Sequence, residues 1–371
     1  MSRRLPRVLI TDETLRDGLQ IEREGITVEE KAGLLSMLVD AGLKRLVVGA
    51  FVNPKWSPQM ADTAQLIARL QPRDGVQYFA LALNERGRQM RRDMSPPLAI
   101  EPLPATHLHL CPTFLKRNTN ATFEQQEAQW RAPVERAAAA GVTHAAIGLS
   151  APWGSNWSGA FTQAQRMESL QRQHRAWTEA AIVVQRVDLA DPMAWNTPQA
   201  VADDVRAILQ AFPSITDFHL HLHNARGMAL LSAYQALQLL DERHTLILDT
   251  AVGGIGGCPY CGNGQATGMI ATEDLVQLLQ VSGIDTGIDL PLLIEASHRL
   301  QELVGRPLAS QVSRNGPLPA AGALYDEDMP AVYTLHEAQH FRLGPSVYEG
   351  NPRPWLRTPP ADSPQDPTTR P

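Results

Sequence analysis

Residues 182–251 contain three short runs of apolar and β-branched residues, IVVQRVDLA (182–190), DFHLHLH (217–223) and TLILDTA (245–251). The helical pattern GMALLSAYQALQLL (227–240) lies between the last two runs. Short apolar runs that alternate with helical segments are typical of parallel strands joined by helices. This stretch therefore predicts consecutive strand–helix units.

Five further runs of the same kind precede it: VLITD (8–12), RLVVGAF (45–51), QYFALAL (77–83), THLHLC (106–111) and HAAIGLS (144–150). Helical stretches such as VEEKAGLLSMLVDAG (28–42) separate them. Thr27 and Glu30 form a capping-box pattern at the start of this helix, and Gly42 lies where it should end. Eight alternations predict a parallel α/β barrel of the TIM (β/α)₈ type.

The length of 371 residues, of which 43% are hydrophobic, suits one barrel of roughly 200–400 residues with a tail. We expect a TIM-barrel catalytic domain over 1–305 and a C-terminal extension over 306–350 that contains one helical candidate, AVYTLHEAQHF (331–341). We expect 351–371 to be a disordered tail, because this polar, proline-rich segment has little apolar surface to bury.

The charge and the hydropathy pattern exclude several classes of protein. A formal net charge of −6 and a pI near 6.0 provide no basic surface for nucleic acid or an anionic membrane. The N-terminus lacks an apolar signal core, and no run of 18 apolar residues occurs. Three cysteines do not make a disulfide framework. We expect a cytoplasmic homo-oligomer with a small-molecule substrate.

The first candidate site residues follow the first strand, in TLRDGLQ (14–20). Active sites of TIM barrels lie at the C-terminal ends of the strands, so polar residues just past each strand are candidates. Asp17 offers an oxygen ligand to a hard divalent cation, and Arg16 offers a charged fork to a substrate oxygen. The alternative is an ion pair on the surface.

The seventh strand carries His219, His221 and His223 on one face, with leucines on the other. Inside a barrel, buried imidazoles need partners. We predict that His221 and His223 bind a metal ion, whereas His219, deeper in the strand, is satisfied by a backbone carbonyl.

A rival pair lies on the fourth strand, where His107 and His109 also alternate. No carboxylate follows directly after that strand, so we interpret this pair as hydrogen-bonded core histidines rather than metal ligands.

Two further candidates follow strands six and eight. Asp191 ends the sixth strand beside Pro192 and is placed to orient a water or a substrate hydroxyl; the alternative is an N-cap of the next helix. The loop GGIGGCPYCGNG (253–264) lets the backbone approach a ligand closely, and Cys258 within it is a candidate proton donor. A redox pair or half of a zinc site is the alternative for Cys-Pro-Tyr-Cys, but a second cysteine pair is missing.

Together these motifs resemble the 3-hydroxy-3-methylglutaryl-CoA lyases, over roughly residues 8–305. The matching segments, in the order found in that family, are RDGLQ (16–20), FVNPKWSPQMAD (51–62), HLHN (221–224), and GGIGGCPY (253–260) with ATED (271–274). The resemblance implies metal-dependent retro-aldol cleavage of a 3-hydroxyacyl thioester through an enolate. The same groups run in reverse would make an aldol- or Claisen-type condensing synthase.

The resemblance also implies roles for individual residues. Asp17, His221 and His223 would bind Mg²⁺ or Mn²⁺, Arg16 would stabilise the enolate, and Cys258 would serve acid–base chemistry. Asp191 matches the family's carboxylate on the sixth strand.

Two positions depart from the family's pattern. Val47 stands where members have a Glu on the second strand, and Met269 stands where they have an Asn metal ligand. Because a thioether is a poor ligand for a hard cation, we expect Asn263 or alternatively Gln265 to replace that ligand. These two departures favour a substrate that differs from that of the 3-hydroxy-3-methylglutaryl-CoA lyases. The alternative is a barrel that binds a ligand without catalysis.

A different function is suggested by HEAQH (336–340), which matches the zinc-protease pattern H-E-x-x-H. The predicted helix around it is short and lies outside the barrel. We therefore interpret the match as coincidental.

Overall fold

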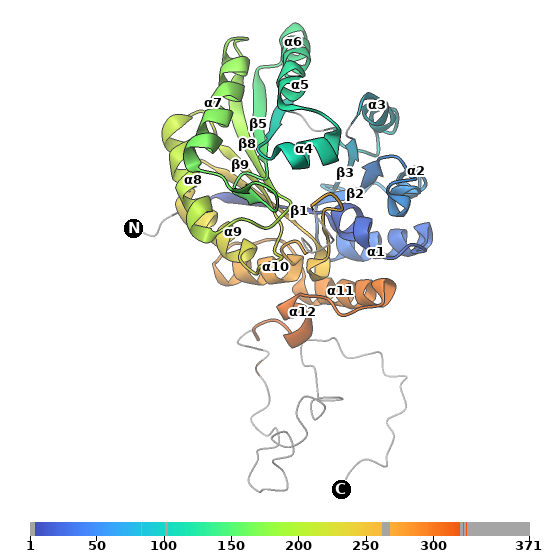
Figure 1. Ribbon diagram of the computed structural model, residues 1–371. Coiled ribbons are helices and arrows are strands. Elements are labelled where there is room, and N and C mark those ends of the chain that lie inside the picture. The colour runs from blue at the N-terminus through green and yellow to red at the C-terminus, as the bar shows by residue number, and fades with distance from the viewer. Residues whose placement is uncertain are drawn as a thin grey trace, which may run out of the picture.

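Eight parallel strands form one curled sheet, in the order β3-β2-β1-β10-β9-β8-β5-β4, with helices around it (Figure 1). The computed structural model describes residues 4–82, 84–100, 103–261, 268–319, 322 and 324. The strands of this sheet are β1 (Arg7–Asp12), β2 (Arg45–Phe51), β3 (Gln77–Ala82), β4 (Ala105–His109), β5 (His144–Ser150), β8 (Val183–Asp191), β9 (Asp217–Leu222) and β10 (Thr245–Thr250).

All eight predicted strands are confirmed, with ends that differ by no more than two residues from the predicted ones. The end strands β3 and β4 follow each other in the chain, and Tyr78 of β3 forms a parallel bridge to Leu98 in the segment leading to β4. The predicted TIM-barrel fold is therefore confirmed. A short hairpin, β6 (Gly154–Ser155) with β7 (Gly159–Ala160), was not predicted.

The helices lie around the sheet, most of them on its outer face (Figure 1). They are α1 (Val28–Asp40), α2 (Thr63–Ile67), α3 (Glu85–Asp93), α4 (Pro112–Thr119), α5 (Phe123–Ala128), α6 (Arg131–Ala139), α7 (Gln163–Thr178), α8 (Pro198–Ala211), α9 (Ala229–Leu239), α10 (Thr272–Val281), α11 (Leu290–Val304) and α12 (Gln311–Asn315). The capping box of Thr27 and Glu30 is present at α1, and Gly42 follows the end of that helix as predicted.

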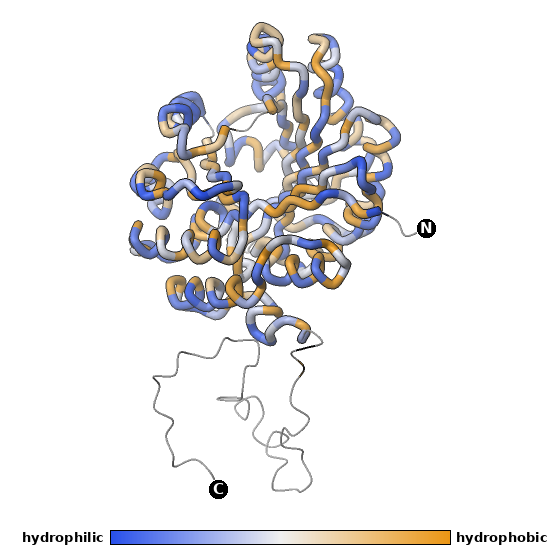
Figure 2. Tube along the Cα trace, turned by 180° about the vertical axis from the view of Figure 1, so that it is seen from behind, coloured by the Kyte–Doolittle hydropathy of each residue, from blue (hydrophilic) through white to orange (hydrophobic). Residues whose placement is uncertain are grey.

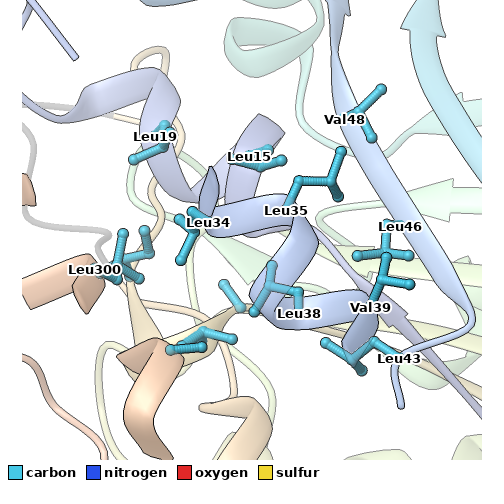
Figure 3. Packing of buried hydrophobic residues seen from close by; sticks show 14 of the residues in the cluster. Leu15, Leu19, Leu34, Leu35, Leu38, Val39, Leu43, Leu46, Val48 and Leu300 are labelled. Atoms are coloured by element: carbon cyan, nitrogen blue, oxygen red, sulfur yellow. The ribbon is translucent and has the colours of Figure 1, made fainter. Parts of the chain in front are cut away.

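The core lies between the strands and the inner faces of the helices. Leu34 and Leu38 of α1 pack with Leu46 of β2 and Leu300 of α11 in one fully buried cluster (Figure 3). Figure 2 shows hydrophobic residues along the central strands, whereas both colours alternate along the outer helices. Burying the apolar face of each helix fixes the strands beneath it, and thereby the loops at their C-terminal ends.

The described part of the C-terminal extension packs on the barrel through α12, a helix that was not predicted from the sequence. Ser310 donates to Asp274 at 2.9 Å, and Ser313 donates to Glu273 at 2.6 Å. The ATED motif therefore ties the extension to the barrel. The helical candidate 331–341 with its HEAQH segment, and the predicted tail 351–371, lie outside the described residues.

Among the residues described, the model contains no helix that combines the length and the apolar character needed to cross a membrane.

Candidate active site

A cavity of about 800 Å³ runs from the loops after the strands down to Arg45 at the start of β2. It lies where the fold places active sites. Five of the residues predicted from sequence line it together: Arg16, Asp17, His221, His223 and Cys258.

A π-helical turn, Thr14–Gly18, follows β1 and positions Arg16 and Asp17. Arg16 Nε lies 2.7 Å from Glu13 Oε2, and Arg16 Nη1 lies 2.6 Å from Asp17 Oδ2. The side chains of Arg16 and Asp17 are only 13% and 4% exposed. The alternative of a surface ion pair is therefore wrong.

Burial and charge act in opposite directions on this pair. Burial alone would lower the pKa of Arg16, but the carboxylates of Glu13 and Asp17 raise it overall. Burial alone would raise the pKa of Asp17, but Arg16, followed by His223 and His221, lowers it overall. Asp17 is thus ionised and Arg16 charged at neutral pH.

The side chains of Asp17, His221 and His223 form a group that we call the metal-ligand cluster. His221 Nε2 lies 3.3 Å from His223 Nε2, and His223 Nε2 lies 3.6 Å from Asp17 Oδ1. Within the described residues, one ligand atom from each lies within 4.8 Å of the others. Two imidazole nitrogens and a carboxylate oxygen are a donor set that fits a divalent cation. A second such group shares His221 with Glu13 and Asp249.

Asp249, which was not among the site residues predicted from the sequence, orients His221 of the cluster. It accepts from His221 Nδ1 at 3.0 Å and from His219 Nε2 at 2.8 Å. The bond to Nδ1 directs Nε2 of His221 toward His223, which is how outer carboxylates commonly orient metal-binding histidines. Asp249 could have been identified from the sequence, because it is a charged residue within the otherwise apolar run TLILDTA.

His219 has carboxylate partners, so its predicted bond to a backbone carbonyl is wrong. Its Nδ1 lies 3.0 Å from Asp188 Oδ1, and its Nε2 contacts Asp249. Burial would lower the pKa of His219, but Asp249 and Asp188 raise it to about 10. His219 is therefore a cation at neutral pH.

We expect this cation to stabilise the metal-free protein in a pH-dependent way. Because the folded pKa is raised, the stabilisation is full below the ordinary value of 6.5 and is lost as the pH rises through about 10. At pH 6, His219→Gln should lower the free energy of unfolding of the protein. Because the His219 side chain is 26% exposed, the decrease should be smaller than the ~3–5 kcal/mol typical of a broken buried ion pair. Urea unfolding should show that the difference in free energy of unfolding between the wild type and His219→Gln becomes smaller toward pH 10. A difference that does not change with pH would contradict the prediction.

The histidines of β4 are hydrogen-bonded within the protein, as predicted. His109 lies 2.8 Å from Gln126 Nε2 and 3.1 Å from Asn118 Nδ2 through its two ring nitrogens. His107 Nε2 lies 2.7 Å from Ser150 Oγ. Neither belongs to a metal-ligand group among the described residues.

Asp191 lies at the end of β8 but is turned away from the cavity. Its carboxylate accepts from the Asn196 backbone at 2.6 Å and from the Asn196 side chain at 2.8 Å. Its neighbours Ala190 and Pro192 line the cavity, whereas Asp191 does not. The alternative of an N-cap is wrong, because Thr197 caps α8.

The glycine-rich loop places Cys258 beside the cluster. Gly257 donates its backbone N–H to Asp17 Oδ1 at 3.2 Å and accepts from Gln20 at 2.9 Å. Gly256 has φ +123°, and a Cβ there would lie 3.0 Å from Asp17 Oδ1. Only glycine allows the backbone at position 256 to lie this close to Asp17. This path of the loop brings Cys258, two residues further along the chain, to the cavity.

Cys258 and Cys261 are free thiols, and neither metal-ligand group within the described residues contains a cysteine. Burial, followed by the contact with Cys258, raises the pKa of the Cys261 thiol. A reactive redox thiol needs a lowered pKa, so the redox and zinc alternatives gain no support.

Of the two departures from the family's pattern, one lines the cavity and the other pairs with a residue of the cluster. Val47 lines the cavity and is 9% exposed. Met269 is buried and forms a backbone bridge with His223. The predicted replacement ligands Asn263 and Gln265 lie outside the described residues.

Comparisons with known proteins agree with this geometry. Residues 7–300 match the family described as HMGL-like. The chain is 31% identical over 299 residues to the mitochondrial hydroxymethylglutaryl-CoA lyase of Bos taurus, covering 81% of this chain and 86% of the relative. It is 32% identical over 325 residues to the (R)-citramalyl-CoA lyase of Chloroflexus aurantiacus, covering 84% and 95%.

A solved structure with the same fold is an HMG-CoA lyase from Acinetobacter baumannii in complex with coenzyme A and 3-methylmalate. Its TM-score is 0.68 at 27% identity, and the match covers 88% of this chain and 97% of that one.

Proposed function

Because this chain belongs to the HMGL-like family, we propose that it is a carbon–carbon lyase that cleaves the coenzyme A thioester of a 3-hydroxy acid by a retro-aldol step. The observation that carries the proposal is the metal-ligand cluster beside the buried, charged Arg16 in one cavity. The reverse condensation would use the same residues, but both relatives named above are lyases.

We assign Asp17, His221 and His223 as the residues that hold a divalent cation, Mg²⁺ or Mn²⁺, with Asn263 as the remaining candidate ligand. The cation supplies Lewis acidity that makes the substrate hydroxyl more acidic and its oxygens better electron acceptors. Asp249 keeps His221 in the orientation that binding requires.

The chain's own residues then move the protons and stabilise charge. Glu13 lines the cavity, and burial raises its pKa overall although Arg16 lowers it, so it is placed to accept the proton of the 3-hydroxyl. The C2–C3 bond breaks, C3 becomes a carbonyl, and the electron pair passes to the thioester enolate. Arg16 stabilises the enolate oxygen, and the Cys258 thiol protonates its carbon. Asp191 acts indirectly, by fixing the loop after β8.

The mouth of the cavity suits a coenzyme A thioester. Trp56, which is 78% exposed, and Arg91 and Arg117 lie there. An exposed aromatic ring and two guanidinium groups match the adenine and the phosphates of that carrier. The coenzyme A bound to the Acinetobacter baumannii neighbour is consistent with this part of the proposal.

A substrate panel tests the function. The purified protein, with Mg²⁺ or Mn²⁺, is incubated with 3-hydroxy-3-methylglutaryl-CoA, citramalyl-CoA and related 3-hydroxyacyl thioesters, and products are identified by mass spectrometry. We expect an acyl-CoA and a carbonyl product in equal amounts from at least one of them. Metal-dependent binding without cleavage of any thioester would favour the non-catalytic alternative.

We expect 3-hydroxy-3-methylglutaryl-CoA to be a secondary substrate, because Val47 replaces a carboxylate with an apolar side chain in the cavity. Val47→Glu should raise kcat/KM on this thioester, by lowering the free energy of its transition state by about 1–3 kcal/mol. Val47→Gln, of the same size but uncharged, is the control. Fast wild-type turnover that slows in Val47→Glu would show that this position has been misinterpreted.

A further inference from the structure

The wall formed by β4, β5, β8 and β9 carries two rows of inward-facing residues. Parallel pairing places Ser150 beside Ala190, and Ala190 beside His221, in the upper row. The lower row, two residues nearer the start of each strand, consists of His107, Gly148, Asp188 and His219. Because neighbouring strands are about 4.8 Å apart, Ser150 lies roughly 10 Å along the wall from His221.

Gly148 leaves room for the His107 ring in the lower row. A Cβ at this position would lie 2.3 Å from His107 Nδ1 and 3.1 Å from the Asp188 carbonyl oxygen. The His107 ring therefore occupies the space that any other residue at 148 would fill. The His107 ring, and not residue 148, therefore lines the cavity at this point of the lower row.

His107 and Ser150 form a hydrogen-bonded pair in this wall, and both line the cavity. Burial lowers the pKa of His107, so its imidazole is neutral at neutral pH. The pair thus offers polar atoms without a net charge. No step proposed above uses either residue.

The charged groups next to this pair compensate one another. Asp188 lies 2.9 Å from Arg186 Nε and 3.0 Å from His219 Nδ1, and His219 also contacts Asp249. The carboxylate of Asp188 is thus already paired with the Arg186 guanidinium. A neutral polar group fits here better than a further carboxylate, which would be buried in the same row as the carboxylate of Asp188.

Next to β4, the neighbouring strands β3 and β2 contribute the apolar side chains of Phe79 and Val47 to the cavity, and the Arg45 guanidinium lies 4.8 Å from the centre of the Phe79 ring. We call the space between these two residues and the pair of His107 and Ser150 the deep chamber. A flexible carbon chain can lie along these two apolar side chains while its end reaches His107 and Ser150.

We propose that the substrate's acyl group carries, on C3, a substituent that extends into the deep chamber and ends in a hydroxyl group bound by Ser150 and His107. These two residues are then specificity-determining. The inference rests on the proposed lyase function for the placement of the thioester at the mouth of the cavity.

The test compares three 3-hydroxyacyl-CoA thioesters that differ only in the C3 substituent: methyl, butyl and 3-hydroxypropyl. The last two have the same length, so their ratio isolates the terminal hydroxyl. Turnover of the Mn²⁺-loaded protein gives kcat/KM. Calorimetry with analogues that lack the 3-hydroxyl, and so cannot undergo retro-aldol cleavage, gives Kd. A site built around a hydroxyl group rejects the analogue that lacks it strongly, so we expect at least about a 10-fold preference for hydroxypropyl over butyl.

Three variants test which residues cause the preference for the hydroxypropyl over the butyl substituent. Ser150→Ala and His107→Phe should each bring the hydroxypropyl-to-butyl ratio close to one. Gly148→Ala should weaken binding of both long substituents and leave the methyl compound unaffected, because the new Cβ displaces the His107 ring. Gly33→Ala is the matched control, since a Cβ there meets nothing within 4 Å, and it should change none of the three.

The two readouts separate the inference from the proposed function. Cleavage with equal ratios in wild type and Ser150→Ala would overturn the deep-chamber inference and leave the lyase proposal intact. A hydroxypropyl preference in Kd that disappears in Ser150→Ala, with no cleavage of any thioester, would support the chamber and overturn the lyase proposal. Binding of none of the analogues would overturn both.

Discussion

Replacing His221 or His223 with alanine is expected to remove bound metal and activity together. Each side chain supplies one of three ligand atoms that meet within 4.8 Å. Loss of a partner outside the ligand set typically lowers metal affinity about 10–100-fold, so loss of a ligand itself should lower it by at least about 100-fold. Metal content after dialysis, measured by inductively coupled plasma mass spectrometry, and calorimetric titration with Mn²⁺ both report the effect.

Two comparisons make this result specific. Asp249→Asn should weaken metal binding by about 10–100-fold and leave the three ligands in place, because it removes the carboxylate that orients His221 and also contacts His219. His336→Ala, in the protease-like HEAQH segment, should leave metal content unchanged. Unchanged metal in both His221→Ala and His223→Ala would refute the site, and loss of metal in His336→Ala would revive the protease alternative.

The fold could be predicted from sequence because each strand has its own local signal. RLVVGAF and HAAIGLS became β2 and β5 with the predicted bounds, since a continuous apolar run is what burial on both faces of a parallel strand requires. The short helix α12 could not be predicted in this way. Its position depends on the hydrogen bonds from Ser310 to Asp274 and from Ser313 to Glu273. These contacts join residues that are 36 and 40 positions apart in the chain.

The ligands of the candidate site could be predicted because alternation along β9 fixes the face on which its histidines lie. The groups around them could not. Asp249 and Asp188 became partners of His219 only because strand register places β8, β9 and β10 side by side. A local pattern records which face a residue occupies, but not which side chain lies across from it. That is why a backbone carbonyl was expected for His219 and two carboxylates were found.

Arg16→Lys is expected to lower kcat by about 10²–10³, the typical effect of removing one donor that stabilises a developing oxyanion. The planar guanidinium contacts Glu13 through Nε and Asp17 through Nη1, which holds it in one orientation in the cavity. A lysine ammonium is a single point charge that cannot hold both carboxylates in the same geometry. Because the enolate charge develops only in the transition state, kcat and kcat/KM should fall together while KM changes little.

The matched control is Arg226→Lys, the same substitution at a second arginine near the site. Arg226 donates to the carbonyl oxygens of Met193 and Ala194 and does not line the cavity, so activity should remain close to that of the wild type. Lys55 is exposed and does not line the cavity, so Lys55→Ala should likewise have a small effect on activity. Metal content must be measured in Arg16→Lys, because Arg16 also contacts the ligand Asp17. Full metal with a large loss of kcat is the expected result; near-normal turnover would show that another group stabilises the enolate.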